Sequence, residues 1–155
     1  MSQVLPIRIV IADDHPRIRS WIRTLLGRER DIQVVGEAEN GQVALELVRR
    51  FQPDILLLDI EMPVMDGLEV MRHLARMKNP VRILILSSYD DPEYLEQAKR
   101  LGGDGYLIKE NSPHQLAGLI RQISQKGRGG ADPVEAIILP LRTRSHPPKH
   151  GPRAG

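Results

Sequence analysis

Five short apolar runs are spaced along the first four fifths of the chain, and we predict that each forms a β-strand. The runs cover residues 7–12, 32–38, 55–58, 81–86 and 105–108. Residues 55–58 are apolar at every position, without the alternation of a half-exposed strand. Such a run is typical of a strand that is buried on both faces, as in a parallel sheet covered by helices.

Amphipathic segments follow the apolar runs, and their apolar residues recur at the spacing of an α-helix. Pro16 suits the first position of the first helix, and Asn40-Gly41 forms a turn before the second. Five successive strand-helix units predict a doubly wound α/β fold, a parallel sheet with helices on both sides. The apolar helix positions are Ile18, Ile22, Leu25, Leu26, Val43, Ala44, Leu47, Val48, Phe51, Leu68, Met71, Leu74, Ala75, Tyr94, Leu95, Ala98, Leu116, Leu119, Ile120 and Ile123.

Gly127 marks the point at which this pattern stops. Residues 127–155 contain five glycines and five prolines, and their end is basic and proline-rich. Their only apolar patch, residues 134–139, is too short to form a core of its own. We therefore predict one domain over residues 1–126, followed by a flexible basic tail over 127–155.

Composition and charge narrow the classes of function. The chain has no cysteine, which excludes disulfides and thiolate chemistry. It has no signal-peptide pattern and no apolar run approaching the length of about eighteen residues that a membrane span needs, so we expect a cytoplasmic protein without membrane contact. Residues 1–126 carry 17 basic and 18 acidic residues, whereas residues 127–155 carry 5 and 2. The domain therefore lacks the cationic bias of a DNA-binding protein, and we expect no DNA binding by this chain alone.

Polar residues follow four of the predicted strands at the point where each strand ends. They are Asp13 and Asp14, Asp59, Ser87 and Lys109. Because the carboxyl ends of parallel strands meet at one edge of a sheet, we expect these side chains to converge. Two carboxylates at ~4 Å repel each other by about 4 kcal/mol at an effective dielectric constant of about 20. A divalent cation would relieve this repulsion, and oxygen ligands together with water favour Mg²⁺.

This arrangement suits phosphoryl transfer. Mg²⁺ and Lys109 would neutralise charge on the transferring group, and Asp59 is placed to attack phosphorus in line. The product would be an aspartyl phosphate. Ser87 could then hydrogen-bond a phosphoryl oxygen, so that a local change of charge would move a loop.

The motifs together resemble the response regulator receiver domain of two-component signalling. They extend over residues 7–126 and occur in the order of that family. The Asp-Asp-His-Pro sequence and the run from Asp90 to Tyr94 resemble most closely the receivers of LuxR-type transcriptional regulators. The motifs are Ile-Ala-Asp13-Asp14-His15, Leu-Leu-Asp59-Ile-Glu-Met-Pro63-x-x-Asp66-Gly67, Leu-Ser87-Ser88 and Gly105-Tyr106-Leu-Ile-Lys109.

The resemblance implies a fold and a set of residue roles. The fold would be flavodoxin-like, with five strands in the order 2-1-3-4-5 and five helices. Asp59 would be the phosphoacceptor, and Lys109 would pair with the phosphoryl group. The switch residues would be Ser87 and Tyr106. The metal ligands would be Asp13, Asp14, Asp59 and the backbone carbonyl of Glu61.

Partners are also implied by the resemblance. The phosphodonor would be a sensor histidine kinase or a phosphotransfer protein, and the surface of residues 91–126 would dimerise or contact an output domain. A receiver is not an enzyme beyond its own phosphorylation and dephosphorylation. LuxR-type regulators carry a helix-turn-helix domain, and residues 127–155 have neither the length nor the pattern of one.

Other functions stay open from the residues alone. A phosphatase that forms an aspartyl phosphate would use Asp-x-Asp, whereas this chain has Asp59-Ile-Glu61 and no evident cap domain. A DNA-binding transcriptional regulator that lacks its output domain is a further alternative. A nucleotide-binding module is disfavoured because the chain has no glycine-rich phosphate loop. Taken singly, Asp14 could be only a helix cap and Tyr106 only a core aromatic.

Overall fold

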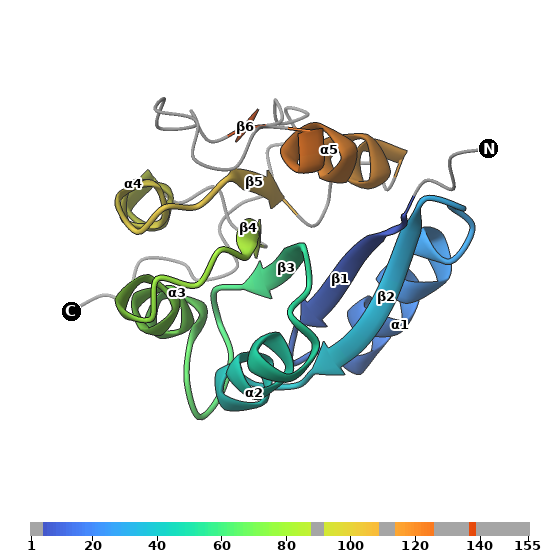
Figure 1. The fold of residues 1–155 in the computed structure, drawn as a ribbon. Coiled ribbons are helices and arrows are strands. Elements are labelled where there is room, and N and C mark those ends of the chain that lie inside the picture. The colour runs from blue at the N-terminus through green and yellow to red at the C-terminus, as the bar shows by residue number, and fades with distance from the viewer. Residues whose placement is uncertain (1–4, 88–91, 109–113, 126–136, 139–155) are drawn as a thin grey trace, which may run out of the picture.

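A parallel sheet forms the centre of the fold in the computed structural model, which describes residues 5–87, 92–108, 114–125 and 137–138 (Figure 1). The strand order is β2-β1-β3-β4-β5-β6, and every pairing is parallel. The predicted order of the first five strands is therefore confirmed. The strands are β1 (Ile7–Ala12), β2 (Ile32–Ala38), β3 (Ile55–Asp59), β4 (Arg82–Ser87), β5 (Gly105–Ile108) and β6 (Ile137–Ile138).

The sixth strand was not predicted. Its two residues, Ile137 and Ile138, belong to the apolar patch of residues 134–139 that we considered too short for a core. They pair with Gly105 and Tyr106 of β5. The pairing needs no core of its own, because the backbone groups on the open side of β5 can bind any short extended segment. The predicted flexibility of residues 127–155 otherwise concerns positions outside the described residues.

Within the described residues, five helices cover the two faces of the sheet, as predicted (Figure 1). Apolar residues of α1 and α5 pack on one face, and those of α2, α3 and α4 pack on the other. Among the residues that the structure describes, no helix is long and apolar enough to cross a membrane. The helices are α1 (Pro16–Leu26), α2 (Gly41–Phe51), α3 (Gly67–Arg76), α4 (Pro92–Arg100) and α5 (His114–Gln125).

Strand β3 shows why the apolar runs have no alternation. Ile55 and Leu57 lie in the cluster under α1 and α5, whereas Leu56 and Leu58 lie in the cluster under α2, α3 and α4. All four side chains are fully buried. Burial on both faces places the strand in the centre of the molecule, and Asp59 is its last residue.

Arg121 connects α5 to the turn between α1 and β2. Its Nε donates to Asp31 Oδ2 at 2.7 Å, and its Nη2 donates to Asp31 Oδ1 and to Glu29 Oε2, each at 2.9 Å. The hydrogen bond from Arg121 holds the pKa of the Asp31 carboxyl below its usual range. The pKa of Arg121 is raised by the same two acidic partners. The contact joins segments that are ninety residues apart in the chain.

We expect Arg121→Gln to lower the free energy of unfolding at neutral pH by up to about 1 kcal/mol, the range of exposed ion pairs. Because the pKa of Asp31 is lower in the folded state, its contribution is complete above the ordinary value of 3.8 and is lost as the pH falls further. Urea denaturation at neutral and acidic pH measures this difference. A deficit that stays constant into acid would contradict the assignment, and Arg72→Gln, at an exposed position on α3, is the matched control.

Candidate functional site

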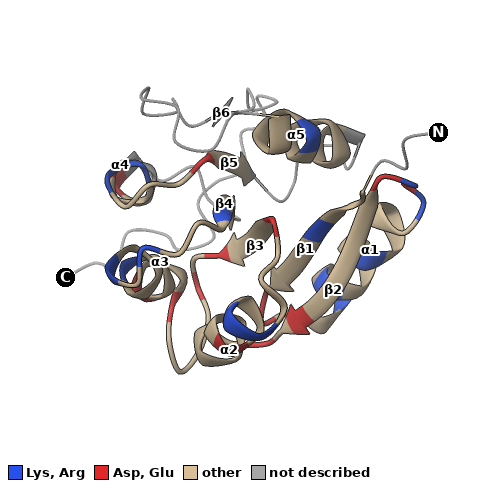
Figure 2. Ribbon diagram, viewed as in Figure 1, with Lys and Arg blue, Asp and Glu red and all other residues tan. Residues whose placement is uncertain are grey.

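The acidic residues predicted to converge lie together at the carboxyl edge of the sheet. Ala12 of β1 pairs with Leu58 of β3, so Asp13 and Asp59 leave adjacent strands at the same level. One ligand atom from each of Asp13, Asp14, His15 and Asp59 lies within 4.8 Å of every other. Figure 2 shows an acidic position at the arrowhead end of β3, which Asp59 ends. The structure thus assembles the predicted acidic pocket from distant parts of the chain.

Burial and local hydrogen bonds fix the two strand-end aspartates. Asp13 is fully buried and Asp59 is 4% exposed, whereas the side chain of Asp14 is 32% exposed. Oδ1 of Asp13 accepts the backbone N–H of His15 at 2.9 Å. Oδ1 of Asp59 accepts the backbone N–H of Glu61 at 3.2 Å. Each buried carboxylate is therefore oriented by the amide two residues further along the chain, which is the geometry of an Asx turn.

His15 is a member of the pocket that the sequence did not predict. Its Nδ1 lies 3.0 Å from Oδ1 of Asp13 and 3.0 Å from Oδ1 of Asp14. The sequence feature that could have indicated His15 is its position directly after the two aspartates. His15 is also the N-cap residue of α1, and no side-chain hydrogen bond caps that helix. The alternative that Asp14 is only a helix cap is therefore wrong.

The loop after Asp59 brings the start of α3 against the end of β3. The N–H of Gly67 donates to the carbonyl of Ile60 at 2.8 Å, and Asp66 caps α3 by accepting the N–H of Glu69 at 2.9 Å. A Cβ atom at Gly67 would lie 2.4 Å from the carbonyl oxygen of Asp59. Only glycine allows this approach, so Gly67 holds the backbone of the predicted phosphoacceptor in place.

Backbone strain marks the tip of the same loop. Val64 has a φ of +68°, which is an uncommon conformation for a β-branched residue, and its side chain is 74% exposed. The neighbouring N–H of Met65 donates to the carbonyl of Pro63 at 2.7 Å. The carbonyl of Met65 in turn accepts the N–H of Gly41 at 3.1 Å, which attaches the loop to the start of α2.

A surface cavity of about 460 Å³ adjoins the acidic pocket. Its lining includes Asp14 and Glu61 from the side of the pocket and Tyr94 from α4. A small molecule or a side chain of a partner protein can approach the carboxylates by this route. The remaining lining residues are Ile60, Met62, Pro63, Asp66 and Leu68.

The predicted switch residues lie on β4 and β5. Ser87 ends β4 one position beyond Leu86, the partner of Asp59 in the sheet, and it is 4% exposed. Tyr106 pairs with Ile85 and is 2% exposed, within the apolar cluster under α2, α3 and α4. Ser87 therefore reaches the edge that holds Asp59, whereas Tyr106 occupies a core position. Lys109 lies outside the described residues.

The donor set of the pocket could hold a metal ion. Three of its four members offer carboxylate oxygens, the ligands that Mg²⁺ prefers. A cation at their centre would also reduce the mutual repulsion of the carboxylates.

The fold is that of a receiver domain, and the chain belongs to the response regulator receiver family. The family model for the response regulator receiver domain matches residues 9–121. The resemblance found in the motifs is thereby confirmed.

Similar proteins include transcriptional regulators, and two similar solved structures are described as LuxR-family response regulators, from Staphylococcus aureus and Aurantimonas. The chain is 37% identical over 121 residues to the transcriptional regulatory protein DegU of Brevibacillus brevis, with 78% of this chain and 51% of DegU covered. It is 38% identical over 122 residues to the nitrate/nitrite response regulator protein NarL of Escherichia coli, with 79% and 56% covered. The chain thus spans about half the length of these curated relatives. The solved signal receiver domain of NarL from Mycobacterium tuberculosis matches with a TM-score of 0.76 and 33% identity, covering 79% of this chain and 99% of that domain.

Proposed function

We propose that the chain is a phosphoacceptor in a two-component pathway, in which Asp59 receives a phosphoryl group from a histidine kinase or a phosphotransfer protein. The single observation that carries the proposal is the convergence of Asp13, Asp14 and Asp59 within 4.8 Å at the carboxyl edge of the sheet. Membership of the receiver family supports it. A cytoplasmic location is part of the proposal.

The pocket supplies the nucleophile and its surroundings. Asp13, Asp14, Asp59 and the backbone carbonyl of Glu61 would hold Mg²⁺, which supplies neutralisation of phosphoryl charge when it is bound. One carboxylate oxygen of Asp59 would form a bond to phosphorus as the P–N bond to the histidine of the donor breaks. The histidine nitrogen keeps the electron pair of that bond, and the imidazole leaves as a neutral ring because its other nitrogen already carries a proton. The N–H of Glu61 orients the Asp59 carboxylate for this attack. Lys109 pairs with the transferred group in this proposal.

Phosphorylation would be transmitted through Ser87 and Tyr106 to the surface of residues 91–126. Ser87 is close enough in the sheet to respond to a new group on Asp59, because it directly follows Leu86, the residue of β4 that pairs with Asp59 of β3. The changed surface then forms a homodimer or binds a partner protein. Matched relatives are transcriptional regulators, so an effect on transcription is the proposed output.

The test is phosphorylation by acetyl phosphate, with and without Mg²⁺. We expect intact-mass spectrometry to show the addition of one phosphoryl group with Mg²⁺, and no addition when EDTA removes the metal, because the carboxylates then repel an anionic donor. Size-exclusion chromatography of the same samples reports any dimer. Equal phosphorylation with and without metal would contradict the proposed site.

A further inference from the structure

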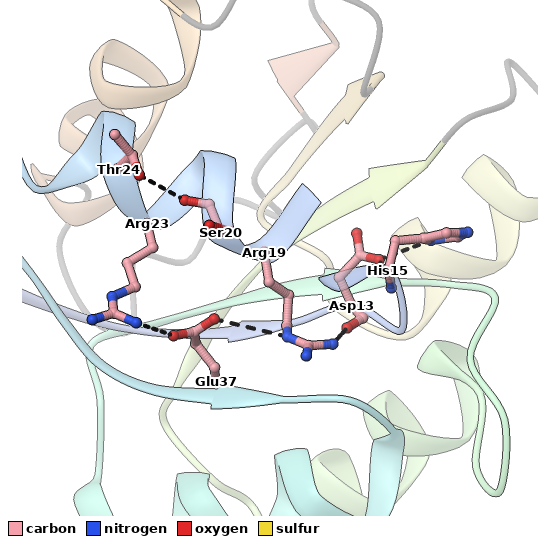
Figure 3. Close-up of polar contacts among 7 residues, drawn as sticks. All are labelled: Asp13, His15, Arg19, Ser20, Arg23, Thr24 and Glu37. Carbon is pink, nitrogen blue, oxygen red and sulfur yellow. Dashed lines mark hydrogen bonds and ion pairs between the residues drawn. The ribbon is translucent and has the colours of Figure 1, made fainter. Parts of the chain in front are cut away.

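Arg19 of α1 reaches back to the backbone of Asp13, as Figure 3 shows. Its Nη1 donates to the Asp13 carbonyl oxygen at 2.6 Å, and its side chain is only 17% exposed. The N–H of Asp13 donates to the carbonyl of Ala38 on β2 at 3.0 Å. The backbone is therefore held on both sides of the Asp13 Cα, by β2 on one side and by Arg19 on the other.

Glu37 of β2 holds the guanidinium of Arg19 in turn (Figure 3). Oε1 of Glu37 lies 3.8 Å from Nε of Arg19, and Oε2 accepts from Nη1 of Arg23 at 3.2 Å. The two arginines are one helical turn apart and flank the same carboxylate. Of the two arginines, Arg19 is the one that also contacts Asp13. Arg23 contacts Glu37, and its side chain is 68% exposed.

We propose that Arg19 is a positioning residue for the acidic pocket. By holding the peptide that joins Asp13 to Asp14, it sets the direction from which both carboxylates enter the pocket, and Glu37 orients Arg19 for this task. The inference deepens the proposed function and rests on it, because it assumes that the pocket binds Mg²⁺. It assigns Arg19 no contact with the metal or the phosphoryl group.

The positive charge of Arg19 allows a positioning role to be distinguished from a purely electrostatic effect on Mg²⁺ affinity. A guanidinium close to a cation site lowers the affinity for the cation, so removal of its charge alone would tighten Mg²⁺ binding. Removal of a positioning contact has the opposite sign, because misplaced carboxylates bind the ion less well. Outer groups that orient metal ligands typically affect affinity about 10–100-fold. The direction of the change therefore decides between the two roles.

The experiment is isothermal titration of the full chain with Mg²⁺ alone, at a temperature where all variants are folded. We expect Arg19→Gln to weaken Mg²⁺ binding about tenfold. Arg19→Lys should recover part of the loss, because it restores the charge and one donor but not the planar fork. The matched control is Arg23→Gln, which removes the other partner of Glu37 and should leave the affinity within about twofold of wild type.

Phosphorylation by acetyl phosphate gives a second measurement. In Arg19→Gln, the Mg²⁺ concentration for half-maximal rate should rise about tenfold, while the rate at saturating Mg²⁺ should approach that of wild type. A merely structural role would lower the melting temperature without moving the Mg²⁺ dependence. Should Arg19→Gln fail to fold, Arg19→Lys takes its place: it keeps the positive charge, so an Mg²⁺ affinity weaker than that of wild type reports the loss of the guanidinium contact.

The outcomes separate this inference from the proposed function. Unchanged or tighter Mg²⁺ binding in the folded variant overturns the role of Arg19. If the wild-type chain itself binds no Mg²⁺ and takes no phosphoryl group, the proposed function fails instead.

Discussion

Asp59→Asn is expected to abolish phosphorylation of the chain by acetyl phosphate. Asparagine keeps the size of the side chain and an oxygen that can accept the N–H of Glu61, but its amide is not a nucleophile for phosphorus. The variant should fold, because it removes one of three mutually repelling carboxylates from a buried pocket. Intact-mass spectrometry after incubation with Mg²⁺ and acetyl phosphate should show no added phosphoryl group.

Asp66→Asn is the matched control for this experiment. Asp66 lines the cavity beside the pocket and caps α3 through the N–H of Glu69. Asparagine caps a helix about as well as aspartate, so the fold should be unchanged. The control is expected to accept one phosphoryl group like the wild type. If Asp59→Asn is phosphorylated to the same extent as this control, the acceptor lies elsewhere in the chain.

Gly67→Ala is expected to lower the free energy of unfolding by about 2–3 kcal/mol, the upper part of the range for overpacking. Its Cβ would lie 2.4 Å from the carbonyl oxygen of Asp59 and 2.8 Å from the Cα of Ile60. Both neighbours are backbone atoms, so no side-chain rotation can relieve the contact. The chain must shift where β3 ends, and this shift should disturb the acidic pocket. The rate of phosphorylation should therefore fall together with the free energy of unfolding.

Urea denaturation measures the change in the free energy of unfolding caused by Gly67→Ala, and Gly118→Ala serves as the control. Gly118 lies inside α5, and among the described residues a Cβ there meets no atom within 4 Å beyond its chain neighbours and the backbone of its own helix. Alanine should therefore stabilise the protein by about 0.5–1 kcal/mol at that position. A free energy of unfolding for Gly67→Ala within about 0.5 kcal/mol of wild type would show that the loop can move away without cost.

Much of the fold could be predicted because buried parallel strands leave continuous apolar runs in the sequence. The bounds predicted for β1 (Ile7–Ala12), β2 (Ile32–Ala38) and β5 (Gly105–Ile108) match those observed. The meeting of Asp13 and Asp59 also follows from topology, because adjacent parallel strands end at one edge. These features depend on the pattern of the chain and not on the conformation of single side chains.

Contacts that depend on side-chain rotamers could not be predicted. The approach of His15 to two aspartates requires one orientation of its ring. Arg19 reaches a backbone carbonyl six residues away, and its partner Glu37 comes from a different strand. Periodicity places such residues on an element but does not say which neighbouring atom they touch. The strand β6 could not be predicted for another reason: its two residues are too few to show a hydrophobic period.

The short strand β6 bears on how self-association of this protein should be studied. A strand with one open side offers its N–H and C=O groups to any other chain, and a very short outermost strand is a natural protection against this. Ile137 and Ile138 give β5 that protection. A fragment trimmed after Gln125 would uncover the flank of β5 and could aggregate or form artificial dimers edge to edge. Oligomers formed by such a fragment would result from the uncovered edge of β5 and not from phosphorylation.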